Sequence, residues 1–184
     1  MPSDYSDIYN MTPTQLLATI GFAEVSKDPK IFEKDAIGIM NVIKNRLKRP
    51  ERFGVTLYDV ILAPNQFSGV GSPEWEKAYQ RKFTKEEERI YKRLLQIAHG
   101  VLTDKIPDPT GGADHYYNPN FTHPHWADVY QKVYSSGAHD YHSELKPLKS
   151  KRNKLTFKEA FAKARREGKK TFYWRGKRYS TRLK

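Results

Sequence analysis

The positive charge of this chain is confined to one end of its sequence. The 184 residues contain 33 Lys and Arg against 21 Asp and Glu, a formal net charge of +12. Residues 147–184 alone hold nine Lys, six Arg and two Glu, a net charge of +13, whereas the preceding 146 residues sum to −1. Because like charges repel when they are packed together, so basic a segment is expected outside the packed core. The chain is therefore predicted to consist of a near-neutral body and a polycationic tail.

We place the body at residues 1–144, a linker at 145–154 and a small basic tail module at 155–184. The body is long enough to bury a hydrophobic core, and 38% hydrophobic and 13% aromatic residues exclude a wholly disordered chain. The charge of the tail favours an anionic partner, such as nucleic acid, anionic lipid or an acidic protein surface. The plain alternative is a solvated appendage without a dedicated ligand.

Several protein classes are excluded by composition. No apolar run approaches the ~18 residues that a membrane-spanning helix needs. The acidic, polar start of the sequence is not typical of a secretory signal peptide, so we expect no signal peptide. The absence of cysteine excludes a disulfide scaffold and cysteine-ligated zinc.

Two capping boxes predict helix starts in the body, at Thr12–Gln15 and at Thr84–Glu87. Each is followed by apolar residues at helical spacing. Between them, apolar residues three and four positions apart from Ala36 to Leu47 predict another helix, which should end before Pro50.

Two stretches of the body read as less regular. Residues 56–72 hold one short apolar run, Val60-Ile61-Leu62, followed by proline and glycine, and predict irregular structure or a short strand. Residues 108–126 are dense in Gly, Pro, Asn, His and aromatics and predict a loop.

The tail shows its own helix and hairpin signals. Thr156–Glu159 is a capping box for a short helix that Gly168 should stop. Residues 171–180 predict a small hairpin that turns near Gly176. The tail is therefore expected to be a basic helix–hairpin module.

Glu24 lies four residues after Ile20, on the apolar face of the first predicted helix and near its end. A carboxylate in such a place is costly to ionise, because desolvation disfavours the charged form. A glutamic acid that keeps its proton near neutral pH can donate it to a leaving group, so Glu24 is the candidate general acid. The competing interpretation is a helix-end glutamate paired with Arg46 or with a backbone amide.

Five histidines between residues 115 and 142 raise the hypothesis of a zinc site. The candidate ligands are His123, His125, His139 and His142, with Asp114 or Asp140 as the oxygen ligand. The helical His-Glu-x-x-His motif is missing, and histidines in an aromatic loop more often stack and form hydrogen bonds. We therefore predict no metal and no cofactor, and keep a zinc-dependent peptidase as an alternative.

Aromatic side chains stand among amide side chains in two short stretches. They are Phe67 beside Gln66, and Tyr116, Tyr117 and Trp126 beside Asn118 and Asn120. Aromatic faces stack on the C–H faces of sugars while amides bind their hydroxyl groups, so this combination favours a carbohydrate ligand. For Phe67 and Trp126, packing in the core is an equally good interpretation.

A set of short motifs follows in a fixed order along the body. It comprises Glu24, Asn45-Arg46, Gln66-Phe67-Ser68, Gly112-Ala113, Tyr116-Tyr117-Asn118-Pro119, Pro124 with Trp126, and Gly137-Ala138-His139-Asp140-Tyr141. In this order the motifs resemble those of the SleB-type cell wall hydrolases, the spore-cortex-lytic family, over about residues 16–142.

The resemblance implies a mainly α (α+β) body: a compact helical domain, similar to lysozyme and lytic transglycosylases, with a few short strands. It also implies action on peptidoglycan, with Glu24 as the catalytic residue. The family glutamate stands in an Ile-x-Gly-Glu-Ala context, whereas here it follows Ile20-Gly21-Phe22-Ala23, one residue later. Glu33 is the nearest substitute.

The same resemblance implies a set of substrate-binding residues. They are Gln66, Phe67, Tyr116, Tyr117, Asn118 and His139, the last at the wall of the cleft or supporting it.

The tail, from Phe157 to Thr181, resembles carboxy-terminal segments of short-tailed bacteriophage proteins. Together the two resemblances imply a phage-encoded lytic transglycosylase that cleaves between N-acetylmuramic acid and N-acetylglucosamine. We expect it in the virion, acting on the host cell wall, with the tail binding virion or tail proteins. Nucleic acid is another candidate ligand of the tail. The alternative from a different class is a structural virion component whose enzyme-like body is inactive. A further alternative is a zinc-dependent peptidoglycan peptidase that cuts the peptide stems.

Overall fold

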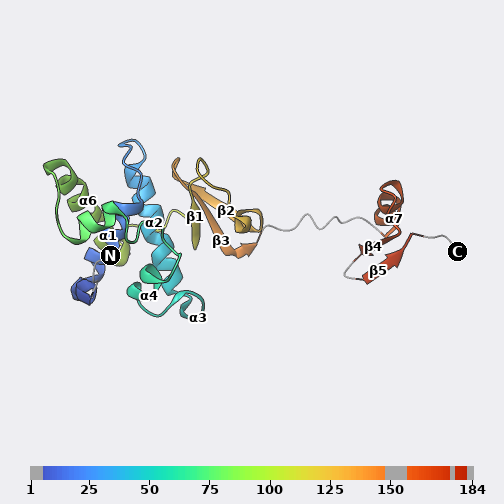
Figure 1. Ribbon diagram of the computed structural model, residues 1–184, viewed down its shortest axis with the longest axis horizontal. Helices are drawn as coiled ribbons and strands as arrows, with labels where there is room; N and C mark the ends of the chain where they lie inside the picture. The colour runs from blue at the N-terminus through green and yellow to red at the C-terminus, as the bar shows by residue number, and fades with distance from the viewer. Residues whose placement is uncertain (1–5, 148–156, 175–176, 182–184) are drawn as a thin grey trace. The chain divides into compact units, whose positions relative to one another are not determined.

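The computed structural model describes residues 6–147, 157–174 and 177–181, which form parts of two compact units, Met1–Leu148 and Lys149–Lys184 (Figure 1). Strand β3 (Asp140–Pro147) continues into the segment expected to be the linker, so residues 145–147 lie in a strand. The rest of the predicted linker, the predicted cap at Thr156 and the turn at Gly176 lie outside the described residues.

Helices make up the first part of unit 1. They are η1 (Ser6–Asn10), α1 (Pro13–Glu24), α2 (Phe32–Leu47), α3 (Pro50–Phe53), α4 (Leu57–Leu62), α5 (Pro73–Tyr79) and α6 (Lys85–Leu102). The capping boxes predicted at Thr12 and Thr84 are both formed, and α2 ends before Pro50, so the three predicted helices of the body are confirmed. No helix in the described part of the chain is long and apolar enough to cross a membrane.

The prediction of irregular structure or a strand in residues 56–72 is wrong over α4. Thr56 and Asp59 form a further capping box, in which the Thr56 hydroxyl accepts the Asp59 N–H and the Asp59 carboxylate accepts the Thr56 N–H. The helix buries Val60 and Ile61 and packs against α1 and α2. A short apolar run fits a buried helical turn as well as a strand, and here the cap and the packing select the helix.

The core of unit 1 forms where α1 packs against α5 and α6, and where α2 packs against α4 and α6. Its largest fully buried side chains include Trp75, Tyr141, Phe22, Leu16, Ile39 and Leu94. Because both helices are closely packed in the core, the carboxyl end of α1 and the amino end of α2 have fixed positions relative to each other.

A three-stranded antiparallel sheet completes unit 1, with strand order β1-β3-β2, and β1 contacts α2 (Figure 1). Its strands are β1 (His115–Tyr117), β2 (Tyr130–Ser135) and β3, and η2 (His125–Asp128) lies between β1 and β2. The predicted loop at 108–126 thus contains a strand that local composition did not reveal. A mainly α body with a few short strands is the predicted fold class.

Unit 2 contains helix α7 (Phe157–Arg166) and the antiparallel strands β4 (Thr171–Trp174) and β5 (Lys177–Ser180). Phe157 stacks on Phe161 and meets the ring of Tyr179 nearly edge-on, at 4.9 Å between centroids. Gly168 follows α7 with a φ of +68°, a conformation that glycine adopts without strain. Small aromatic contacts therefore join the helix to the hairpin.

Gly38 allows the sheet to approach helix α2. A Cβ atom at this position would lie 2.6 Å from Cζ of Tyr141, whose hydroxyl reaches the Asp35 carboxylate 2.9 Å away. A side chain at residue 38 would therefore force the tyrosine ring out of its place.

We expect Gly38→Ala to lower the free energy of unfolding by about 1–3 kcal/mol, because the rigid Tyr141 ring has to move. Denaturant unfolding measures the change. Lys34→Ala, at an exposed position of the same helix, should change it by less than about 0.5 kcal/mol. Equal stability of the two variants would contradict this account of the packing.

Candidate active site

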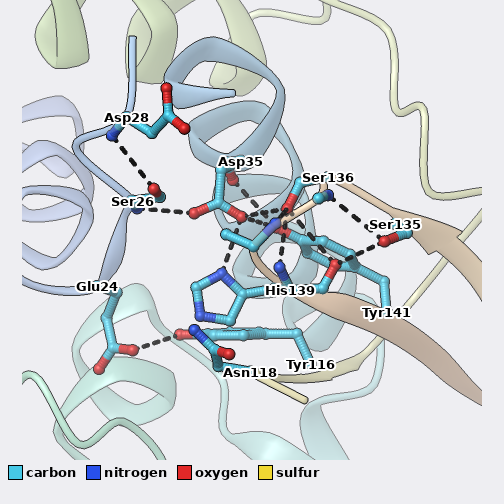
Figure 2. A network of polar contacts seen from close by, with 12 residues as sticks. Glu24, Ser26, Asp28, Asp35, Tyr116, Asn118, Ser135, Ser136, His139 and Tyr141 are labelled. Atoms are coloured by element: carbon cyan, nitrogen blue, oxygen red, sulfur yellow. Dashed lines mark hydrogen bonds and ion pairs between the residues drawn. The ribbon is translucent and has the colours of Figure 1, made fainter. Parts of the chain in front are cut away.

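Glu24 is the last residue of α1, and its half-buried carboxylate meets two other segments of the chain. Oε1 accepts hydrogen bonds from the backbone N–H of Gly69 and, at 3.4 Å, from the Ser68 hydroxyl. Oε2 accepts the Tyr116 hydroxyl at 3.0 Å, a contact drawn in Figure 2. Of the two pairings considered for Glu24, a backbone amide is therefore the one formed.

Gly69 is placed so closely against α1 that a side chain would not fit. A Cβ atom there would lie 2.7 Å from Oε1 of Glu24 and 2.9 Å from Cβ of Ala23. The absence of a side chain lets the loop after α4 bring a backbone N–H to the carboxylate, which fixes one of its two oxygens.

Tyr116 holds the other oxygen of Glu24 and is itself surrounded by rings. Desolvation, reinforced by the nearby charge of Glu24, raises the pKa of the Tyr116 hydroxyl well above its usual value. The hydroxyl therefore remains protonated and can donate to the carboxylate. The ring of Phe67 lies 6.2 Å away, and the ring of His139 lies 5.2 Å away and nearly perpendicular.

Arg46 places a buried positive charge beneath this site. Its Nε donates to the Asp114 carbonyl at 2.8 Å, and a terminal nitrogen donates to Oε1 of Gln66 at 3.3 Å. The guanidinium also lies over the ring of Phe67, 4.9 Å from its centroid. Desolvation lowers the pKa of Arg46, partly opposed by the charges of its neighbours. Arginine stays charged under such conditions. The charged guanidinium donates to the amide oxygen of Gln66 and so holds that side chain beside the site.

Asp35, in the first turn of α2, is a fully buried carboxylate surrounded by donors. Oδ1 contacts the hydroxyls of Ser136 at 2.6 Å and Tyr141 at 2.9 Å, and Nδ1 of His139 at 2.9 Å. Oδ2 accepts the Ser26 N–H at 2.8 Å. Burial raises the pKa of Asp35, but the hydrogen bonds, led by that from His139, outweigh it and leave the pKa below its ordinary value. Asp35 therefore carries a negative charge at neutral pH.

A tight turn between β2 and β3 presents His139 to Asp35. The Ser136 N–H donates to the His139 carbonyl, and Gly137 adopts a φ of +102°. The Ser136 hydroxyl also accepts the backbone N–H of His139 while it donates to Asp35. Figure 2 shows the His139 ring between Asp35 and Tyr116.

The residues expected to bind sugar are only partly brought together. Tyr116 and His139 lie at the Glu24 site, and the exposed Gln66 is held beside it by Arg46. Phe67 is only 6% exposed and belongs to the core, which was the alternative for this residue.

Tyr117 takes another place, and Asn118 has a structural contact of its own. Successive residues of a strand face opposite sides, so Tyr117 turns away from Tyr116 and packs against Trp126, His123 and His142. Asn118 is drawn with Tyr116 and His139 in Figure 2, and its side-chain oxygen accepts the Asn120 N–H in the turn after β1.

Asp35 is not among the site residues predicted from the sequence. A signal was present, because an acidic residue sits next to Ala36 at the edge of the apolar stripe of α2. Its partners Ser136, His139 and Tyr141 are about a hundred residues away in sequence, so the pattern of α2 alone could not name them.

The histidines considered as zinc ligands do not converge. His139 binds Asp35, His123 contacts Asp128 at 2.9 Å, and Nδ1 of His142 lies 2.9 Å from the Tyr130 carbonyl. Within the described ranges, the set of side chains whose atoms could meet on a cation is Asp114, His115 and Glu144. Arg49 binds both carboxylates of that set, at 2.8 and 3.0 Å. This ion-pair network gives the zinc hypothesis no support.

Comparisons with known proteins agree with this architecture. The family model described as Cell Wall Hydrolase matches residues 33–142. The catalytic domain of the Bacillus cereus SleB protein matches with a TM-score of 0.51 and 24% identity, over 78% of this chain and 95% of that one. The catalytic domain of the germination-specific lytic transglycosylase SleB from Bacillus anthracis matches with a TM-score of 0.50 and 21% identity, over 78% and 100%. Curated protein sequences give no significant match.

The family match spans more than half of the chain, which therefore belongs to the cell wall hydrolase family. Its body has the fold of the SleB catalytic domains, as the sequence motifs implied. The chain is thus a peptidoglycan cell wall hydrolase. Glu24 lies before the matched range, so its role rests on the geometry of the site.

The buried charge of Asp35 makes a testable contribution to stability. Because the pKa of Asp35 is lower in the folded than in the unfolded chain, this contribution is present above the ordinary value of 3.8 and is lost as the pH falls through the folded pKa. At pH 7 we expect Asp35→Asn to lower the free energy of unfolding by about 3 kcal/mol. Urea unfolding of both proteins at pH 7 and about pH 3 should show the difference shrinking in acid. A difference independent of pH would contradict an ionised Asp35.

Proposed function

We propose that this protein is a lytic transglycosylase that cleaves the bond between N-acetylmuramic acid and N-acetylglucosamine in peptidoglycan. The observation that carries the proposal is the Glu24 carboxylate, held by the Gly69 N–H and the Tyr116 hydroxyl on the fold of the SleB catalytic domains. The SleB relative from Bacillus anthracis is itself described as a lytic transglycosylase.

In the proposed reaction, Glu24 acts first as an acid and then as a base. Its carboxyl proton passes to the glycosidic oxygen, and the bond from that oxygen to the anomeric carbon of the muramic residue breaks. The Glu24 carboxylate then takes the proton of the C6 hydroxyl of the same muramic residue. At the same time the C6 oxygen forms a bond to the anomeric carbon. The products are a 1,6-anhydromuramyl end and a free saccharide, and Glu24 regains its proton.

The surroundings of Glu24 suit this exchange of a proton. A phenol both donates and accepts hydrogen bonds, so Tyr116 remains a partner whether Glu24 carries its proton or not. The route needs no second carboxylate as a nucleophile, unlike the usual pair of carboxylates in glycosidases. The nearby Asp35 is covered by four donors and fully buried, and so is not offered to a sugar.

We expect Glu24→Gln to lower the rate of glycan cleavage by about 10²- to 10⁴-fold, because the amide can neither donate nor regain the proton. Mass spectrometry of purified peptidoglycan after digestion measures both rate and product. Anhydromuramyl ends that disappear in the variant support the proposal.

Glu33→Gln is the matched control. Glu33 is an exposed glutamate of α2 paired with Arg93 at 2.7 Å and makes none of the contacts that hold Glu24, so its variant should keep full activity. Reducing muramic ends would indicate hydrolysis by water on the same scaffold, and cut peptide stems would indicate a peptidase. A folded Glu24→Gln protein of full activity would refute the assignment of Glu24, and an inactive wild type would favour a structural virion component.

We further propose that the protein is phage-encoded and carried in the virion, with unit 2 as its docking module. The resemblance of the tail to short-tailed bacteriophage proteins supports this, as does the confinement of the positive charge to residues 147–184. A separate compact unit that exposes Lys158, Lys163, Arg165, Arg166, Lys169 and Lys170 suits an acidic protein surface.

Deletion of residues 149–184 should abolish incorporation into phage particles and leave wall cleavage by the purified body within about twofold, because the Glu24 site lies wholly in unit 1. Immunoblots of purified particles and digestion of peptidoglycan measure the two effects. Full-length Glu24→Gln is the control, and it should be incorporated normally. Normal incorporation of the truncated protein would contradict docking through unit 2.

Binding of the full chain to nucleic acid that weakens steeply with salt would instead assign the tail that ligand.

A further inference from the structure

The Asp35–His139 pair is not required by a mechanism in which Glu24 is the sole proton carrier, yet it is one of the most elaborate polar arrangements of the body. Asp35 is inaccessible to solvent, and His139 is 8% exposed. Four donors converge on a carboxylate that is charged at neutral pH. Charge burial of this kind is costly. Buried, hydrogen-bonded carboxylates with a shifted pKa are found more often at functional sites than elsewhere.

The two nitrogens of the His139 ring have different surroundings. Nδ1 faces Asp35 at 2.9 Å, so the ionised carboxylate requires a proton on Nδ1. Nε2 has no hydrogen-bond partner among the described residues, and unlike Nε2 of His142 it is not sealed from solvent. Figure 2 shows this second nitrogen on the side of the ring away from Asp35, toward Asn118 and the hydroxyl of Tyr116 that contacts Glu24.

A proton on Nδ1 leaves a lone pair on Nε2 of the neutral imidazole, so Nε2 is a hydrogen-bond acceptor. The edge-to-face contact with Tyr116, at an interplanar angle of 86°, and the backbone turn at Ser136 restrict rotation of the ring. An acceptor of fixed direction next to Glu24 fits a hydroxyl or amide N–H of an N-acetylated glycan.

We propose that Asp35 is a positioning residue that acts through His139: it fixes the imidazole tautomer so that Nε2 accepts a hydrogen bond from the bound glycan beside Glu24. The proposal rests on the glycan-cleaving function proposed above. It adds to that function a buried residue which never touches the sugar and yet sets the direction of one of its hydrogen bonds.

The tautomer is measured on the wild-type protein, independently of any activity. Long-range ¹H–¹⁵N correlation of the His139 ring at about pH 8, where histidine is ordinarily neutral, should show a protonated Nδ1 and an unprotonated Nε2. Addition of a GlcNAc–MurNAc tetrasaccharide to the Glu24→Gln protein should shift the ¹⁵N resonance of Nε2 more than that of Nδ1. A proton on Nε2 in the free protein, or an Nε2 resonance unmoved by saturating tetrasaccharide, would overturn the proposal.

Asp35→Asn tests the consequence for binding. The Ser26 backbone N–H can only donate, so the oxygen of the new asparagine side chain has to face it and the NH2 group then faces His139 Nδ1. Nδ1 becomes the acceptor, and Nε2 carries the proton. Calorimetry with the same tetrasaccharide, in the Glu24→Gln background, should show the Kd of the glycan rising about tenfold. The protonated Nε2 of His139 would then face a hydroxyl or N–H donor of the glycan, and the hydrogen bond would be lost.

Asp108→Asn is the matched control for loss of a carboxylate. Asp108 also accepts four hydrogen bonds, from Asn45, Gly112 and twice from Thr110, but it touches no residue of the Glu24 site. Its Kd should change less than twofold. Equal weakening in the two variants, both folded by circular dichroism, would make Asp35 merely structural. If the proposed function is wrong, the Glu24→Gln protein will still cleave the tetrasaccharide, which is observed separately from binding. The measurement of the His139 tautomer on the free protein does not depend on that result.

Discussion

The hydrogen bonds around the Asp35 carboxylate are the interaction on which the rest of unit 1 depends. They reach the loop after α1 through Ser26, the turn between β2 and β3 through Ser136 and His139, and β3 itself through Tyr141. A buried carboxylate that lacks a hydrogen-bond partner is unstable, because it has lost its solvation by water and nothing in the protein replaces it. The carboxylate therefore fixes the position of the sheet relative to the helices. Close packing of nonpolar side chains alone would define that position less precisely.

Placement of the sheet against α2 also determines the geometry of the candidate active site. Antiparallel pairing sets Tyr116 of β1 opposite Tyr141 of β3, so the docking of β3 on Asp35 also places β1, which carries the phenol that reaches Glu24. From the other side, Gly69 brings its backbone N–H to the same carboxylate, because no side chain intervenes. Glu24 and the two groups that hold it thus come from three separate segments of the chain, and no local sequence pattern links them.

Local sequence patterns predicted the helices well, since a capping box such as Thr12–Gln15 or Thr84–Glu87 contains its own hydrogen-bond partners. They failed at α4, where the apolar run Val60-Ile61-Leu62 suits a strand or a helix equally and the decision came from the Thr56–Asp59 cap and packing. They also grouped Tyr116 with Tyr117, because composition carries no information about which face of a strand each residue occupies.

By itself the sequence determined the family, the mainly helical fold class, the separation of a basic tail from a neutral body and the candidacy of Glu24. All of these are written in short motifs, apolar spacing and charge, which act over a few residues. Only the tertiary structure decided which side chains hold Glu24, that Asp35 belongs beside His139, and that Tyr117 turns away. The physical reason is that these contacts join residues that are far apart in the chain, and their geometry exists only once the core has packed and the buried charge has found its donors.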